Sequence, residues 1–139
     1  TPSNSSAASD VYKRQPGECP YQLGEKLLEA GRTEEALLAF QRAAARAPTE
    51  GLKARCELKV ASILMKEERE EEALGRALRV LYLYPEEKEA GALALLIAAE
   101  IYKARGEGKK ARQACRKALG LSAEEEVARR AKDICGKGL

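Results

Sequence analysis

The chain has 139 residues, with 25 lysine and arginine residues against 22 acidic residues and a formal net charge of +3. It contains no histidine, which excludes a histidine general base, a Ser-His-Asp or Cys-His nucleophilic site and any histidine-ligated metal. The weak and mixed charge does not by itself indicate a nucleic-acid partner. The length suits one domain that can bury a core without disulfides or metal.

The first fifteen residues do not resemble the rest of the chain. Residues 5–15 read SSAASDVYKRQ and resemble the conceptual translation of a sequencing-library adapter. We therefore expect residues 1–15 to be a non-native, disordered tail, and the protein itself to span residues 16–139 with its natural N-terminus missing. A natural serine-rich tail is the alternative, and it predicts the same disorder.

From Pro20 onward, composition and spacing predict helices throughout. Alanine, leucine, glutamate, lysine and arginine dominate, and glycine or proline recurs at intervals that fit helices of about 12 to 18 residues. Apolar residues three and four positions apart predict amphipathic helices over residues 34–47, 68–84 and 109–121. The uncharged stretch at residues 91–99 is too short to cross a bilayer and is expected to be a buried helix.

Capping and breaking residues mark the expected helix ends. Thr33 is the expected N-cap of the helix that precedes Pro48, and Pro85 is expected to end the next one. The residues from Ser122 to Glu125 have the form of a capping box. A last helix is therefore expected over residues 123–135, followed by a terminating glycine.

Three segments repeat a pattern of glycine, alanine, large apolar residues and proline. The matching positions are Leu23, Gly24, Leu27, Gly31, Ala36, Phe40 and Pro48, then Val60, Ala61, Leu64, Ala73, Ala77 and Pro85, then Ala98, Ala99, Tyr102, Gly106, Ala111 and Cys115. This pattern resembles the tetratricopeptide (TPR) repeat family. The resemblance implies an all-α, right-handed solenoid of three TPR-like helix-turn-helix pairs, at about residues 17–50, 51–87 and 88–121, plus a C-terminal capping helix at residues 122–135. An alanine-rich antiparallel bundle is the alternative.

The small residues of this pattern carry its packing logic. Ala36, Ala73 and Ala111 are 37 and 38 residues apart, and we expect them at the crossing of the two helices of each pair. A larger side chain there would push the helices apart. The period is longer than the family norm, and lengthened first helices of this kind resemble those of bacterial cell-envelope members of the family.

The resemblance implies a non-catalytic scaffold that binds a protein or peptide on the concave face formed by the first helix of each pair. The predicted groove residues are Tyr21, Glu25, Leu28, Arg55, Leu58, Lys59, Ser62, Met65, Leu96, Glu100 and Lys103. Such a surface suits a peptide with hydrophobic anchors and mixed charge. A solvated helix face is the alternative for each charged residue.

Other function classes find less support. The second helix of the third predicted pair carries a basic stripe. This stripe suggests electrostatic binding of nucleic acid or a membrane surface, but it lacks interleaved aromatic residues. The stripe consists of Lys109, Lys110, Arg112, Arg116 and Lys117. The carboxylates occur in runs typical of solvent-facing charge, so we expect no enzyme, cofactor, metal or small-molecule substrate.

The four cysteines include no C-x-x-C motif. Cys19 and Cys56 occupy the same place in adjacent first helices, and Cys115 and Cys135 could face each other across the last two helices. Pairing would matter in an oxidising compartment, but buried thiols acting as small hydrophobic residues are the preferred interpretation. Cellular location stays open.

Overall fold

The computed structural model describes residues 20–136, and within this range the chain is all-helical, as predicted, with seven helices and no strand. The expected tail at residues 1–15 and Cys19 lie outside the described residues. The helices are α2 (Pro20–Glu29), α3 (Thr33–Arg46), α4 (Glu50–Lys66), α5 (Glu70–Leu83), α6 (Lys88–Ala104), α7 (Gly108–Leu121) and α8 (Glu125–Cys135). No helix in this part of the chain is both long and apolar enough to cross a membrane.

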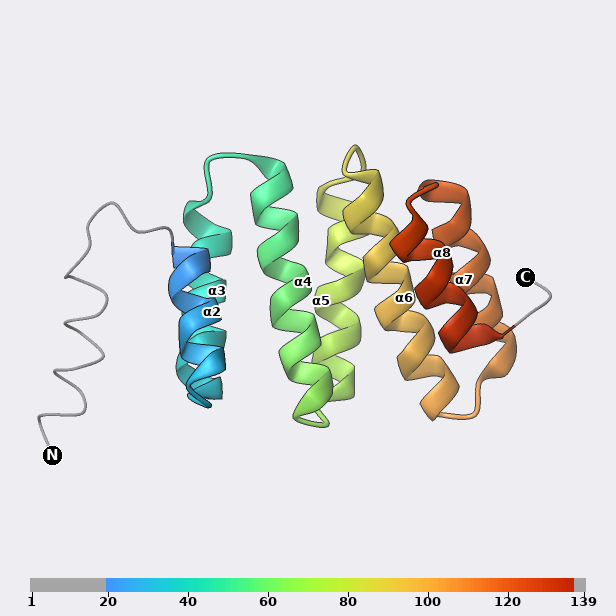
Figure 1. Cartoon of the computed structure of the whole chain (residues 1–139), viewed down its shortest axis with the longest axis horizontal. Helices are drawn as coiled ribbons and strands as arrows, with labels where there is room; N and C mark the ends of the chain where they lie inside the picture. The colour runs from blue at the N-terminus through green and yellow to red at the C-terminus, as the bar shows by residue number, and fades with distance from the viewer. Residues whose placement is uncertain (1–19, 137–139) are drawn as a thin grey trace, which may run out of the picture.

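The helices stand in two rows. Each helix packs on the next one along the chain, and additional contacts join α4 to α6 and α6 to α8. Figure 1 shows α2 in front of α3, α4 in front of α5, and α8 in front of α7. The row of α2, α4, α6 and α8 is called the front row below, and the row of α3, α5 and α7 the back row.

The same turn joins the two helices of each pair. In each turn, the backbone N–H of the last residue donates to the carbonyl oxygen five residues earlier. The donor–acceptor distances are 2.9 Å from Arg32 to Leu27, 2.9 Å from Arg69 to Leu64 and 2.8 Å from Glu107 to Tyr102. This is the Schellman arrangement, which needs a left-handed residue in the turn. That residue is Gly31 (φ 77°), Glu68 (φ 62°) or Gly106 (φ 78°). The turns recur with the spacing of the three alanines.

Several predicted helix ends are confirmed and two are wrong. The helix α3 ends before Pro48, α5 ends before Pro85, and α8 ends at Cys135. Thr33, however, is the first residue of α3 and not its N-cap. The preceding Schellman turn ends at Arg32, which is therefore the N-cap. The capping box of α8 does not form either, because the Ser122 hydroxyl accepts from the N–H of Glu124 at 3.2 Å and the helix begins two residues later than predicted.

Small residues occupy the helix crossings. Ala36 and Ala73 are fully buried and Ala111 is 3% exposed. A Cβ on Gly24 would lie 2.7 Å from the ring of Phe40, so only glycine lets these two helices approach this closely. The predicted buried helix at residues 91–99 is also confirmed, since within it only Leu93 is partly exposed.

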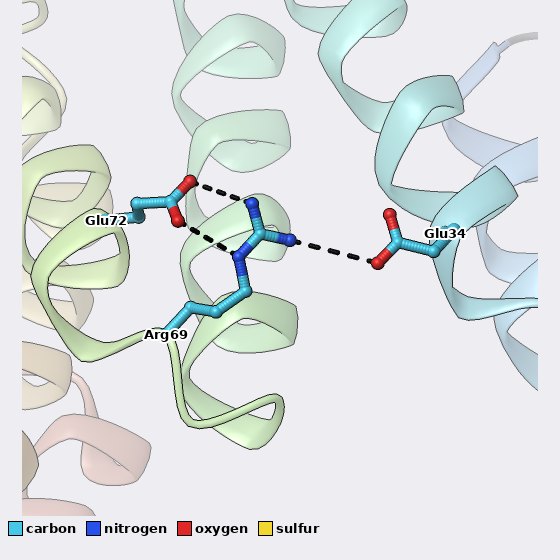
Figure 2. A network of polar contacts seen from close by, with 3 residues as sticks. All are labelled: Glu34, Arg69 and Glu72. Carbon is cyan, nitrogen blue, oxygen red and sulfur yellow. Dashed lines mark hydrogen bonds and ion pairs between the residues drawn. The ribbon is translucent and has the colours of Figure 1, made fainter.

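A charged pair follows each turn, between its last residue and the residue three positions on. The closest distances are 2.7 Å for Arg32 and Glu35, 2.9 Å for Arg69 and Glu72, and 3.3 Å for Glu107 and Lys110. Arg69 also reaches Glu34 of the preceding pair at 3.8 Å (Figure 2). Arg105 likewise pairs with Glu70 and Glu71. The acidic run at residues 67–72 therefore includes ion pairs between neighbouring helix pairs.

One carboxylate is buried. Glu57 on α4 is 4% exposed, and its oxygens lie 3.3 Å from Arg76 and 3.9 Å from Arg79 of α5. Burial raises the pKa of the nearby Tyr84 hydroxyl, and the negative charge of Glu57 raises it further. Sequence reasoning did not single out Glu57, whose partners lie on the next helix.

A disulfide joins α7 to α8 through Cys115 and Cys135. The preferred expectation of thiols is therefore wrong for this pair, while the expected proximity of the two residues is confirmed. The reason is geometric, since α8 folds back on α7 and brings its last residue to the middle of that helix. Cys56 is buried.

Candidate partner-binding groove

A groove of about 630 Å³ runs along the front row. It is bounded by residues of α2, α4, α6 and α8, with Thr33 at the start of α3. The structure brings eight of the eleven predicted site residues into its lining, namely Tyr21, Leu28, Arg55, Leu58, Lys59, Ser62, Met65 and Glu100.

The groove has an apolar floor. Leu58, Ile63 and Ile97 are at most 9% exposed and form its base. Met65 and Leu93 line it while remaining partly exposed. An occupant could therefore bury apolar side chains on these two residues without moving the core.

Cations dominate its rim. Arg55 and Lys66 are exposed, and neither forms an ion pair with a residue in the described range. Lys59 lies 4.0 Å from the Glu25 carboxylate and 5.9 Å from the centre of the Tyr21 ring. An exposed pair at this distance contributes at most about 1 kcal/mol, so the Lys59 ammonium can exchange Glu25 for another anion.

The aromatic wall of the groove is held from behind. The Tyr21 ring packs edge-on against the buried Phe40 ring, with centroids 5.4 Å apart. Phe40 in turn occupies the space left by Gly24. The helix crossing of the first pair therefore positions Tyr21 beside Lys59.

A second hollow of about 370 Å³ continues the groove between α4 and α6. The two hollows share Arg55, Leu58 and Leu93. Arg55 thus stands at the junction of the two hollows, and the second hollow is also lined by Glu87 and Glu89. A continuous path of this kind suits a chain segment better than a compact ligand.

Three predicted residues are not in the lining. Glu25 is adjacent, through its pair with Lys59. Leu96 is fully buried in the core between α6 and α8, so its prediction as a groove residue is wrong. Lys103 turns away and donates from Nζ to the Ile134 carbonyl oxygen at 2.7 Å, capping the end of α8. Leu96 and Lys103 differ from the prediction for the same reason, because α8 covers the side of α6 on which they lie.

The sequence prediction missed Arg130. This residue of α8 lines the groove, and its guanidinium lies 4.0 Å from the Glu100 carboxylate. The sequence predicts the last helix only as a cap. The helix α8 lies in the front row, where the first helix of a fourth pair would stand. Its place in the order of helices was therefore the signal that could have identified Arg130.

Within residues 20–136 no group of three histidine, cysteine, aspartate or glutamate side chains could hold a metal ion. No protein-family model matches the chain, and no curated protein matches it in sequence.

Proposed function

We propose that this chain is a TPR-like solenoid that works as a non-catalytic binding scaffold. The support for the repeat architecture is the recurrence of one turn geometry at Gly31, Glu68 and Gly106, in register with the buried alanines. The two rows of helices agree with it, because solenoids of helix pairs place their first helices along one face.

The proposed binding site is the front-row groove, and its proposed occupant is a chain segment that combines acidic and large apolar side chains. The observation that carries this proposal is the position of Arg55, an exposed cation without an ion pair in the described range, at the junction of two hollows that share Leu58 and Leu93. A carboxylate would gain an ion pair there while its neighbours covered Met65 and Leu93.

The proposed setting is an assembly in the bacterial cell envelope. The support is the disulfide between Cys115 and Cys135, because disulfides persist in oxidising compartments such as the periplasm. The lengthened first helices point in the same direction.

The test begins with selection of binding peptides from a displayed random library on the wild-type protein. We expect acidic and large apolar residues to be enriched. The selected peptides should then lose about tenfold or more in affinity for R55E/K59E, and a similar amount for M65A/L93A, as measured by fluorescence anisotropy.

The matched control is R46E/R129E. It changes the net charge by the same amount, and both residues are exposed and lie outside the groove. Binding should change by less than about threefold, as expected for remote surface charges. Peptides that bind all three variants equally well would overturn the proposed site, provided that circular dichroism shows each variant folded.

A further inference from the structure

A second groove, of about 550 Å³, lies on the back row and shares no lining residue with the first. Leu78 and Leu81 of α5 form one wall, and Leu121 of α7 belongs to the other. Tyr102 and Leu95 of α6 contribute to the floor. This α5–α7 groove therefore has an apolar wall on α5 and a mixed wall of apolar and polar side chains on α7.

The α7 side of the groove is cationic. The helix carries five lysine and arginine residues and no acidic residue. Only two of the five, Lys110 and Lys117, line the groove. Both are exposed, and Lys117 has no ion pair among the described residues.

The position of Lys110 over the groove is defined by its contacts. Its Nζ lies 5.7 Å from the centre of the Tyr102 ring and 3.3 Å from the Glu107 carboxylate. The Lys110 side chain is 64% exposed, so its ammonium stays accessible to an anion in the groove beside its contact with the buried Oε2 of Glu107.

The spacing of these groups selects an occupant. Lys110 and Lys117 are two helical turns apart, about 10 Å along the axis of α7. Leu78 and Leu81 face them across the groove. A helix with acidic residues at positions i and i+7 and large apolar residues at i+3 and i+4 presents the complementary pattern at the same spacing.

We propose that the α5–α7 groove binds an acidic amphipathic helix of a partner protein. Two features favour this occupant over an extended polyanion or an anionic lipid surface. The leucine wall on α5 offers nothing to a phosphate backbone, and a flat surface would engage Lys109 and Arg116, which are exposed but lie outside the groove, as strongly as the two lysines that line it. The proposal does not depend on the front-row groove.

The test uses a fluorescent stapled helix with glutamates seven positions apart and leucines three and four positions after the first glutamate. We expect K110E/K117E to weaken its binding about tenfold or more, because both matched charges are reversed. K109E/R116E is the matched control, with the same change of net charge on the same helix, and should weaken binding less than about threefold.

Leu78→Ala tests the apolar wall. It removes a partly exposed side chain and should weaken binding by about fivefold, with folding checked by thermal denaturation. A probe with glutamines in place of the glutamates should bind the wild-type protein as weakly as the original probe binds K110E/K117E.

Three results would overturn the proposal. The first is no saturable binding of the stapled helix, and the second is an equal loss in K110E/K117E and K109E/R116E. The third is binding to phosphatidylserine vesicles or single-stranded RNA that both double variants weaken equally and that competes with the stapled helix. That third result would assign α7 to a general electrostatic surface.

Discussion

The two halves of the core solve the same packing problem with different side chains. Around α2 to α5, the large side chains of Phe40 and Leu64 are almost fully buried in the core. Around α6 to α8, six of the eleven buried core residues are alanines. The second half thus brings its helices close together but removes less apolar surface from water per residue.

This difference explains why the C-terminal helix needs other attachments. The helix α8 buries only Val127, Ala131 and Ile134. The disulfide to α7 and the hydrogen bond from Lys103 supply what apolar burial does not. The helix α8 is thus held on an alanine-rich surface by specific bonds, whereas the first pair is held by its large side chains.

Removal of the disulfide gives the largest expected effect. The variant C115A/C135A should lose about 3 kcal/mol of unfolding free energy, because the bond closes a loop with a sequence separation of 20. Hydrogen exchange should rise first in α8, where the buried surface is smallest. Urea denaturation and exchange mass spectrometry of the oxidised and reduced wild-type protein provide the same comparison without mutation.

The N-terminal half, around α2 to α5, serves as the internal control for this measurement. Exchange in α2 and α3 should be unchanged on reduction. An equal rise of exchange in α3 and α8 would show that the two halves unfold together and would remove the distinction between them.

Overpacking at the helix crossings gives the next largest effect and compares the halves directly. Ala36→Leu in the first half and Ala111→Leu in the second should each cost about 1 to 3 kcal/mol, because both alanines are buried against a facing helix. Ala45→Leu on the exposed side of α3 should be close to neutral. Chemical denaturation measures all three, and equal effects at the three positions would contradict the register of the pairs.

The sequence predicted the fold class because the signals for it are local. Helical spacing, Pro48 and Pro85 depend on neighbours along the chain, and the structure confirms what they indicated. The two wrong helix starts, at Thr33 and Ser122, come from a competition that the sequence does not display. Each side chain could cap a helix, but the turn before α3 makes Arg32 its N-cap, and Ser122 is the C-cap of α7.

The groove was predictable only in part, for a different reason. Arg55, Lys59 and Met65 follow from the spacing within one helix. Leu96 and Arg130 depend on where α8 lies, which is a long-range property of the chain. A residue of α8 can line the groove between the earlier helices only once the helices have assembled into rows.

The three turns offer a smaller, opposite pair of effects. Glu68 holds a left-handed conformation that costs a residue with a Cβ about 1 kcal/mol, so Glu68→Gly should stabilise the protein by up to that amount. Gly31→Ala and Gly106→Ala, in the outer turns, should destabilise it by a similar amount, since a Cβ meets no atoms there and only the backbone is strained. Thermal denaturation distinguishes the signs, and stabilisation by all three changes would contradict a shared turn geometry.

The smallest expected effect comes from the edge where the first two pairs meet. Hydrogen bonds from Arg69 hold the pKa of the Glu72 carboxyl below its usual range, and the same contacts raise the pKa of Arg69. A lowered folded-state pKa means that Glu72 stabilises the protein above its unfolded pKa of about 4.3 and that this contribution is lost as pH falls through the folded value. The melting temperature of wild type should therefore exceed that of E72Q at neutral pH, and the gap should close as the pH falls below about 4.

The control is E86Q, because Glu86 is exposed and has no ion pair among the described residues. Salt should shrink the gap as well, since both side chains are solvated. A gap that is the same at neutral and acidic pH would mean that Glu72 acts through packing and not through its charge.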